Sequence, residues 1–306
     1  MSAAKSSSAK RQPTPEKGAK RNRNARRARN ARRAGRRNWT LWIVVGLIIV
    51  VFSALLVVSV SSGGGGSSSS ADSRKPAPAA LVAKVTSVPQ SVADEVGLGT
   101  AKVPVALNGP SEASDGKPVV TYMGAEYCPY CAGERWAMVL ALSRFGTFSN
   151  LSTTHSASED VLPNTQTFSF HGSTYSSPYI KFDPVELQTN QLVGSTYGKL
   201  DSLTAAQEQL VSKYDASPYF SSSGGIPFVD FAGKYALSGA SYDVSALQGM
   251  SATEIAAALH DPKSPVAQGI VGTANAITAA ICSATGNQPA SACNTAAVKA
   301  VQAKLS

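Results

Sequence analysis

Hydrophobic positions follow two different patterns along this chain of 306 residues. Residues 39–60 form a continuous apolar run that is dominated by Ile, Val and Leu and contains no charged side chain. A helix of this length extends about 33 Å, which matches a bilayer hydrocarbon core of about 30 Å. This run predicts one transmembrane helix over residues 38–62. From residue 80 onward, apolar positions recur at the spacings of strands and short amphipathic helices, which indicates a folded body.

Periodicity, caps and turn residues predict a series of elements within this body. We expect strands at residues 119–123, 151–156, 226–231 and 234–237, and a strand-rich pair at 165–175 and 179–182. We expect helices at residues 91–96, 132–145 (with Gly146 as its C-cap), 203–214, 252–259, 266–281 and 292–305. The order is strand, helix, strand, insertion, strand, strand, helix and a helical hairpin, which predicts a layered α/β domain.

Composition divides the chain into four parts. Residues 1–37 are basic and polar, so we expect a disordered tail that cannot form a core. The transmembrane helix follows, and residues 63–79 are rich in Gly, Ser and Pro, which is typical of a flexible linker. The folded domain is expected over residues 80–306.

The net charge of +9 is concentrated at the N-terminus. Residues 1–37 hold fourteen of the 28 Lys and Arg residues and a single acid, Glu16, so the rest of the chain carries a net charge of −4. A mildly acidic body gives no electrostatic reason to expect nucleic acid as a partner. We interpret the tail as a solvated topology determinant that also contacts anionic lipid head groups. RNA binding by the tail is the alternative, but the tail has no aromatic residue for base stacking.

The basic tail also predicts the orientation. Arg and Lys residues lie directly before the apolar run, and no charge follows it until Asp72. The positive-inside rule then places the N-terminus in the cytoplasm and the body outside the cell membrane, as a single-pass protein. A cleaved signal peptide is the competing interpretation, but its apolar region is usually only about 7–15 residues long.

Four cysteines lie in two local pairs, Cys128 with Cys131 and Cys282 with Cys293. An even count with this grouping favours two local disulfides and an oxidising compartment. We expect a Cys282–Cys293 disulfide to join the last two predicted helices. An electron relay between the two pairs is an alternative that nothing in the spacing favours.

The sequence Cys128-Pro129-Tyr130-Cys131 follows a predicted strand and begins a predicted helix. Thiol–disulfide exchange needs a thiolate, and a helix N-terminus stabilises one through its free N–H groups and its dipole. We therefore predict that Cys128 is an exposed nucleophile, that Cys131 is the buried resolving thiol, and that the pair rests as a disulfide. Pro129 suits the first helical position because it has no N–H to satisfy. Structural zinc is a weaker alternative because it needs four ligands. A purely structural disulfide is also a weaker alternative, because the motif begins a helix after a buried strand.

A second signal is Ile226-Pro227 at the start of a predicted strand pair. A proline there marks a sheet edge, a bulge, a cis peptide or simply the start of a strand. Together with the strand, the CxxC motif and the helix, it resembles the thioredoxin superfamily. The resemblance implies a cis proline at Pro227 that faces the two cysteines, and a substrate that pairs with the backbone of Ile226.

The wider stretch at residues 124–136 resembles an uncharacterised prokaryotic family of membrane-anchored thioredoxin-like proteins, catalogued as a domain of unknown function. The predicted insertion, at about residues 165–220, is similar to those of periplasmic disulfide oxidoreductases. One departure is Tyr127, where thioredoxins usually have Trp. Another is that the strand before the motif has no Asp at the usual buried position. Glu126 is then a candidate proton acceptor for Cys131, although a solvent-facing carboxylate is the more common role for a Glu beside a helix start.

These observations lead to one main function and two alternatives. We expect a membrane-anchored extracytoplasmic thiol–disulfide oxidoreductase that acts on exported proteins containing cysteines, with no metal and no cofactor. A partner that recycles the dithiol, such as a membrane oxidase, is expected from the location alone. The alternatives are a non-catalytic thioredoxin-like binding module and a structural protein of the cell envelope.

Overall fold

Strand β4 (Lys117–Gly124) lies at the centre of the largest sheet. The computed structural model describes residues 73–305. Along one edge β4 pairs antiparallel with β12 (Phe228–Phe231), which is followed outward by β13 (Tyr235–Ser238) and β2 (Val105–Ala106). Along the other edge, the first two residues of β4 pair with β3 (Ala113–Ser114), and the rest pairs in parallel with β9 (Lys181–Glu186).

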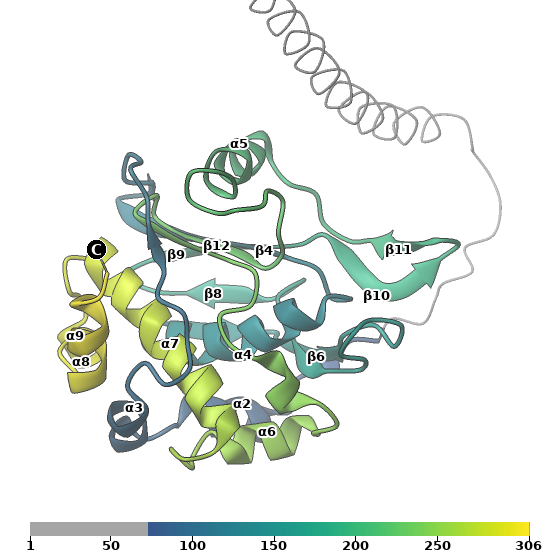
Figure 1. Cartoon of the computed structure of the whole chain (residues 1–306), viewed down its shortest axis with the longest axis horizontal. Helices are drawn as coiled ribbons and strands as arrows, with labels where there is room; N and C mark the ends of the chain where they lie inside the picture. The colour runs from purple at the N-terminus through teal and green to yellow at the C-terminus, as the bar shows by residue number, and fades with distance from the viewer. Residues whose placement is uncertain (1–72, 306) are drawn as a thin grey trace, which may run out of the picture. The chain divides into compact units, whose positions relative to one another are not determined.

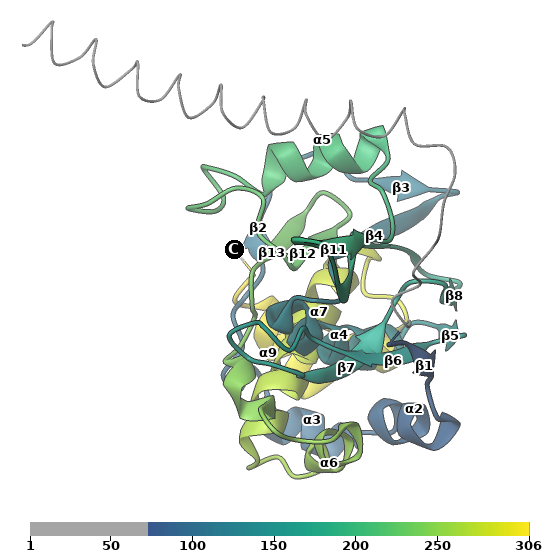
Figure 2. The ribbon, with the colours of Figure 1, turned by 90° about the vertical axis from the view of Figure 1, so that its right-hand side faces the viewer.

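Alternation along β4 divides its side chains between two apolar layers. Val120 and Tyr122 belong to the main core, whereas Met123 belongs to a smaller cluster on the opposite face. Successive strand residues point to opposite faces, so both faces of this sheet need a cover. Helices α4 (Pro129–Leu142) and α7 (Pro265–Ala284) lie against one face, and α5 (Ala205–Tyr214) lies over the other (Figures 1 and 2).

Shorter elements complete the body around these layers. Helices α2 (Ala79–Thr86), α3 (Gln90–Val96) and α6 (Ala252–Ala258) form an outer layer beyond α4 and α7 (Figure 2). Residues 73–305 also form three small sheets. One joins β1 (Lys75–Pro76), β6 (Ser152–His155) and β7 (Gln166–Ser169), the second joins β5 (Thr147–Ser149) and β8 (Thr174–Ser176), and the third joins β10 (Gln188–Val193) and β11 (Thr196–Lys199).

The structure confirms most of the elements that periodicity predicts, and the mixed α/β class with them. The strand before the CxxC motif, the helix after it, the later strand pair and the helix capped by Ser251 are all present. The side chains of Thr204 and Ser251 each form a capping box, which accounts for the starts of α5 and α6. The predicted Gly146 cap is wrong, because α4 ends at Leu142 and its C-cap is Ser143.

Strand order along the chain does not give the pairing of the strands. Residues 151–156 were predicted as the second strand, and β6 pairs there with β1 and β7 in a sheet separate from β4. The strand that joins β4 is β9, which lies within the stretch predicted as an insertion. Two segments therefore interrupt the main sheet: one lies between α4 and β9, and the other is the β10–β11 hairpin after β9. Strand propensity is local, whereas the choice of partner depends on contacts far apart in sequence.

The predicted N-terminal tail and transmembrane helix lie outside the described residues. Part of the predicted linker belongs to the folded body, because Lys75 and Pro76 pair with β6. Within residues 73–305, α7 is the one helix long and apolar enough to cross a membrane. In that stretch 89% of residues are buried, so the core accounts for its apolar character.

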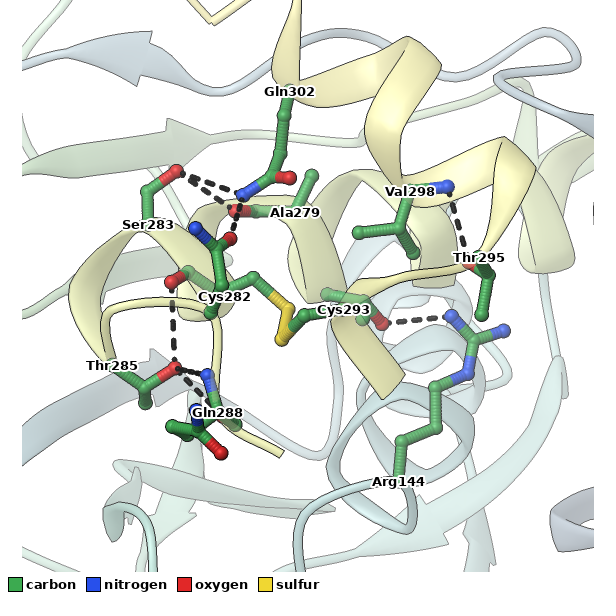
Figure 3. Close-up of a disulfide and its surroundings, with 12 residues drawn as sticks. Arg144, Ala279, Cys282, Ser283, Thr285, Gln288, Cys293, Thr295, Val298 and Gln302 are labelled. Carbon is green, nitrogen blue, oxygen red and sulfur yellow. Dashed lines mark hydrogen bonds between the residues drawn. A yellow bond between two sulfur atoms is a disulfide. The ribbon is translucent and has the colours of Figure 1, made fainter. Parts of the chain in front are cut away.

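A disulfide closes the C-terminal helical hairpin. Cys282 on α7 bonds to Cys293, the last residue of α8 (Ala290–Cys293), as Figure 3 shows. The single helix predicted at residues 292–305 is wrong, because α8 and α9 (Ala296–Gln302) are separate helices. The Cys282–Cys293 disulfide is confirmed, and it fixes α8 against the end of α7.

One buried carboxyl group on the α5 face of the main sheet was not anticipated. Asp230 of β12 is 0% exposed and lies opposite Thr121 of β4. One of its oxygens accepts a hydrogen bond from the backbone N–H of Gly233 at 2.9 Å. Burial raises the pKa of Asp230 to about 7, in spite of that hydrogen bond. The carboxyl group is therefore largely protonated in the folded state below neutral pH.

We predict that removing the C-terminal disulfide by the double substitution Cys282→Ala and Cys293→Ala lowers the free energy of unfolding. The two cysteines are 11 residues apart, and a loop of that length corresponds to about 2–3 kcal/mol of lost chain entropy. Urea unfolding of the full-length chain with and without reductant measures the loss. The matched control, Cys128→Ala with Cys131→Ala, should keep its sensitivity to reductant. Equal stability of the wild-type chain under both conditions would contradict the prediction.

We also predict that Asp230 makes the protein less stable as the pH rises. Its pKa is higher in the folded state than in the unfolded chain, so the folded state binds the extra proton between about pH 4 and 7. The contribution of Asp230 to the free energy of unfolding is fully present below that window. It is lost as the pH rises through the window, by on the order of a few kcal/mol. Urea unfolding across this range measures the change. Asp230→Asn keeps an acceptor for Gly233, and its stability should depend less on pH; an unchanged dependence would argue against the assignment.

Candidate functional site

Helix α4 begins at the CxxC motif. Cys128 is its N-cap and has extended backbone angles, and Pro129 is its first residue. The Cys128 sulfur accepts a hydrogen bond from the backbone N–H of Cys131 at 3.3 Å. A side chain that accepts from the free N–H groups of a helix start normally contains oxygen, and here a thiol sulfur takes that position. The helix start thus supplies the N–H groups and the dipole that favour a thiolate on Cys128.

Of the two expected local disulfides, only Cys282–Cys293 is present in the described residues; Cys128 and Cys131 are free thiols, in contrast to the predicted resting disulfide. Both thiols are buried, with Cys128 4% and Cys131 0% exposed. The predicted exposure of Cys128 is therefore wrong, although Cys131 is buried as expected. One reason is that the loop before β12 approaches the motif, and the Ile226 carbonyl oxygen lies 3.8 Å from the Cys128 sulfur.

The Ile226–Pro227 peptide bond is cis, as the resemblance implied. The two segments are far apart in sequence, but β12 pairs with β4, and the pairing of Phe228 with Met123 brings their ends together. The predicted cysteine pair and the predicted Ile226-Pro227 signal therefore lie at one site, formed where β4 ends, α4 begins and β12 begins. Substrate binding by Ile226 and Pro227 stays a prediction.

The two thiols differ in their proton affinity. The pKa of Cys128 lies below its ordinary value, chiefly because the Cys131 thiol hydrogen-bonds to its sulfur, while burial opposes the shift. The Cys131 backbone N–H and the charge of Arg135 add to the lowering. Burial raises the pKa of Cys131 well above the usual range, and the hydrogen bond to Cys128 adds to the increase. This asymmetry fits one nucleophilic thiolate and one protonated neighbour.

Glu126, the candidate proton acceptor, is not solvent-facing. Its side chain is 0% exposed, it accepts a hydrogen bond from the Ser169 hydroxyl at 2.5 Å, and it lies 3.6 Å from Arg74. Burial raises the pKa of Glu126. These contacts direct the carboxyl group toward β7 and the start of the described chain, so the solvent-facing alternative is wrong. The predicted role toward Cys131 stays a prediction that these contacts do not favour.

A buried ion pair that no sequence pattern indicated links α4 to β9 near the motif. Arg135 of α4 and Glu186 of β9 are both 0% exposed, and their side chains form two hydrogen bonds of 2.7 and 2.6 Å. Arg135 also donates to the Ala125 carbonyl at 2.7 Å. The helical spacing of Arg135 from Cys131 could have indicated a shared face, but its partner on β9 depends on the parallel strand pairing.

Tyrosine side chains lie beside and within the CxxC motif. Tyr127, next to Cys128, stacks on Tyr197 of the β10–β11 hairpin with ring centroids 4.3 Å apart. Tyr130, inside the motif, is 41% exposed. Hydrogen bonds to backbone atoms hold this region in place, including one from the Glu126 N–H to the Gln188 carbonyl at 2.8 Å. The hairpin after β9 is therefore attached directly to the loop that precedes Cys128.

The comparisons with known proteins place the chain in a family. Residues 104–283, more than half of the chain, match the family described as Domain of unknown function (DUF929). The chain belongs to this family. The match includes the CxxC motif, Ile226-Pro227 and all strands of the main sheet, and it ends just after Cys282. No curated protein and no solved structure matches the chain.

We predict that Cys128 is alkylated before Cys131 when the reduced chain is treated with iodoacetamide near neutral pH. The lowered pKa of Cys128 gives it more thiolate, whereas the raised pKa of Cys131 keeps that thiol protonated. Peptide mapping by mass spectrometry over a pH series measures both rates. Cys128→Ser is the matched variant, and its remaining Cys131 should react only at higher pH. Faster labelling of Cys131 would contradict the assignment.

Proposed function

We propose that this protein is a thiol–disulfide oxidoreductase with a thioredoxin-like fold, and that Cys128 and Cys131 are its redox pair. The observation that carries the proposal is the Cys128 sulfur at the N-cap of α4. There it receives the N–H of Cys131 and faces the carbonyl of the cis Ile226–Pro227 peptide. A structural role for the cysteines alone would not require this asymmetric pair of thiols.

The topology of the main sheet supports the fold assignment. Four of its strands lie in the order β13, β12, β4 and β9, and β9 is parallel to β4 while β12 is antiparallel. The chain passes from β4 through α4 to β9, then through α5 to β12 and β13, and on to α7. This order includes the strand, the CxxC motif, the helix and the later proline before a strand pair on which the resemblance to the thioredoxin superfamily rests, and that agreement supports the proposed fold.

The exchange reaction proceeds in two steps. The Cys128 thiolate attacks one sulfur of a substrate disulfide, which forms a mixed disulfide and releases the other substrate sulfur as a thiolate. The Cys131 thiol then loses its proton and attacks the Cys128 sulfur, which releases the second substrate thiolate and leaves the Cys128–Cys131 disulfide. The substrate gains two electrons and two protons, which the dithiol loses. The reverse sequence would oxidise a substrate dithiol.

Location narrows the class of substrate within this proposal. The basic tail and the apolar run predict an anchored protein with its body outside the membrane, where exported proteins acquire disulfides. The substrates would then be exported proteins that contain cysteines, and a membrane-bound redox partner would restore the pair. The even number of cysteines supports an oxidising compartment. The tail and anchor would contribute position and anionic lipid contact, not chemistry.

A non-catalytic binding module is the second candidate, and the burial of Cys128 favours it. At 4% exposure, the sulfur reaches a substrate only if a segment packed against it moves, such as the loop at Ile226. A pair with a reduction potential below about −300 mV and a Cys128 that resists alkylation would point to this alternative.

We predict that Cys131→Ala traps a mixed disulfide and that Cys128→Ala does not. Without Cys131, the adduct between Cys128 and the substrate lacks its resolving thiol and accumulates. The test incubates the reduced full-length variants with a peptide that contains one intramolecular disulfide, followed by acid quenching and mass spectrometry. Cys282→Ala with Cys293→Ala is the control, and it should exchange at the wild-type rate. Adducts on neither variant would remove the enzymatic proposal.

A further inference from the structure

Arg135 lies one helical turn after Cys131, so both side chains leave the same face of α4. The arginine side chain is 0% exposed, although a guanidinium group remains charged in proteins. Burial alone would lower the pKa of Arg135. The carboxylate of Glu186 and the Tyr122 side chain outweigh that effect, and the pKa lies above its ordinary value. A permanent positive charge is therefore buried beneath the two thiols.

Ala125 connects this charge to the cysteines through the backbone. Its carbonyl oxygen accepts from Arg135 Nη2 at 2.7 Å and from the backbone N–H of Cys128 at 3.2 Å, and the backbone of Ala125 also lowers the pKa of the Cys131 thiol. Ala125 follows directly after β4, so the end of the central strand lies between the guanidinium group and the resolving thiol. The position of Arg135 is fixed by this contact as well as by Glu186.

Glu186 compensates the positive charge only in part. Its oxygen Oε1 accepts from Arg135 Nε and also from the backbone N–H of Phe170 at 3.3 Å, so not all of its hydrogen-bonding capacity serves Arg135. Arg135 Nη1 is buried and donates to no residue among those at positions 73–305. The guanidinium group also lies 6.0 Å from the centre of the Tyr122 ring, whose electron-rich face attracts a cation without cancelling its charge.

Three other titratable groups lie near the pair. Burial raises the pKa of Tyr122 well above its ordinary value and that of Tyr127 to about 12, so both rings are neutral at neutral pH. Glu126 lies two residues before Cys128, and its carboxyl group contacts Ser169 and Arg74. Among the charged residues, Arg135 lowers the pKa of both Cys128 and Cys131.

We propose that Arg135 is a positioning residue whose buried charge stabilises the reduced, partly ionised Cys128–Cys131 pair, and that Glu186 moderates this effect. The inference rests on the proposed function and goes further, because it identifies the residues that adjust the equilibrium between dithiol and disulfide. Stabilising the thiolate favours the dithiol over the disulfide, which makes the disulfide a stronger oxidant. It also stabilises Cys131 as a thiolate when that residue attacks the mixed disulfide.

The proposal predicts opposite effects for the two members of the ion pair. Arg135→Met removes the cation, so the pKa of Cys128 should rise and the equilibrium with glutathione should move about tenfold toward the disulfide. Glu186→Gln leaves the cation uncompensated, so both quantities should move the other way by a similar factor. A tenfold change corresponds to about 30 mV in reduction potential. The measurements are the pH profile of iodoacetamide alkylation of Cys128 and equilibration of the full-length chain in glutathione buffers.

Two further variants separate an electrostatic role from a structural one. Arg144→Met removes a second, half-buried arginine, which lies just after α4, hydrogen-bonds to Asn275 and Thr278, and points toward Cys293 in Figure 3. It should lower stability without changing the alkylation profile of Cys128. If either single variant of the pair fails to fold, Arg135→Met with Glu186→Leu replaces the pair by apolar groups, a change that buried ion pairs often tolerate. The pKa of Cys128 in that variant should lie above the wild-type value.

The outcomes are distinct. The role of Arg135 is overturned if Arg135→Met and Glu186→Gln shift the alkylation profile in the same direction or not at all. A wild-type profile in the double variant also overturns it. These measurements need no substrate protein. Opposite shifts in a chain that forms no mixed disulfide would keep the electrostatic role and reject the enzyme. Normal exchange with unshifted profiles would reject only the role of Arg135.

Discussion

The ion pair between Arg135 and Glu186 joins the helix that carries the cysteines to the strand that completes the main sheet. Both side chains are fully buried, so each would be costly without the other. Their hydrogen bonds fix α4 relative to β9, and the bond from Arg135 to Ala125 fixes it relative to the end of β4. The position of both thiols depends on this arrangement, because α4 is buried along almost its whole length and has no solvent-facing side.

Burial explains why the site combines reactive and protected features. The N-cap position and the buried cation favour a thiolate on Cys128, while the Ile226 loop covers its sulfur. Close packing also limits what the neighbouring residues can be. A Cβ at Gly124 would clash with the Tyr122 hydroxyl, and one at Gly133 would lie 2.6 Å from a methyl group of Val244. A larger residue at either position would therefore have to displace a buried side chain.

Local chemistry was sufficient for most of the elements and for two parts of the site. The apolar run before Cys128, the proline after it and the apolar spacing of the following helix predicted β4 and α4 at nearly their observed bounds. The same local signals could not predict that β9 rather than β6 lies beside β4, because parallel pairing joins segments about 60 residues apart. For that reason no local pattern pointed to Glu186, or to its ion pair with Arg135.

The sequence by itself determined the CxxC motif at a helix start, the pairing of Cys282 with Cys293 and the mixed α/β class, because each depends on neighbours close in the chain. Only the tertiary structure decided which residues surround the thiols. It brought Ile226 to the Cys128 sulfur through the pairing of β12 with β4, buried a thiol that was expected to be exposed, and directed Glu126 toward Ser169. The physical reason is that exposure and electrostatic environment depend on packing between segments far apart in sequence, which no local pattern encodes.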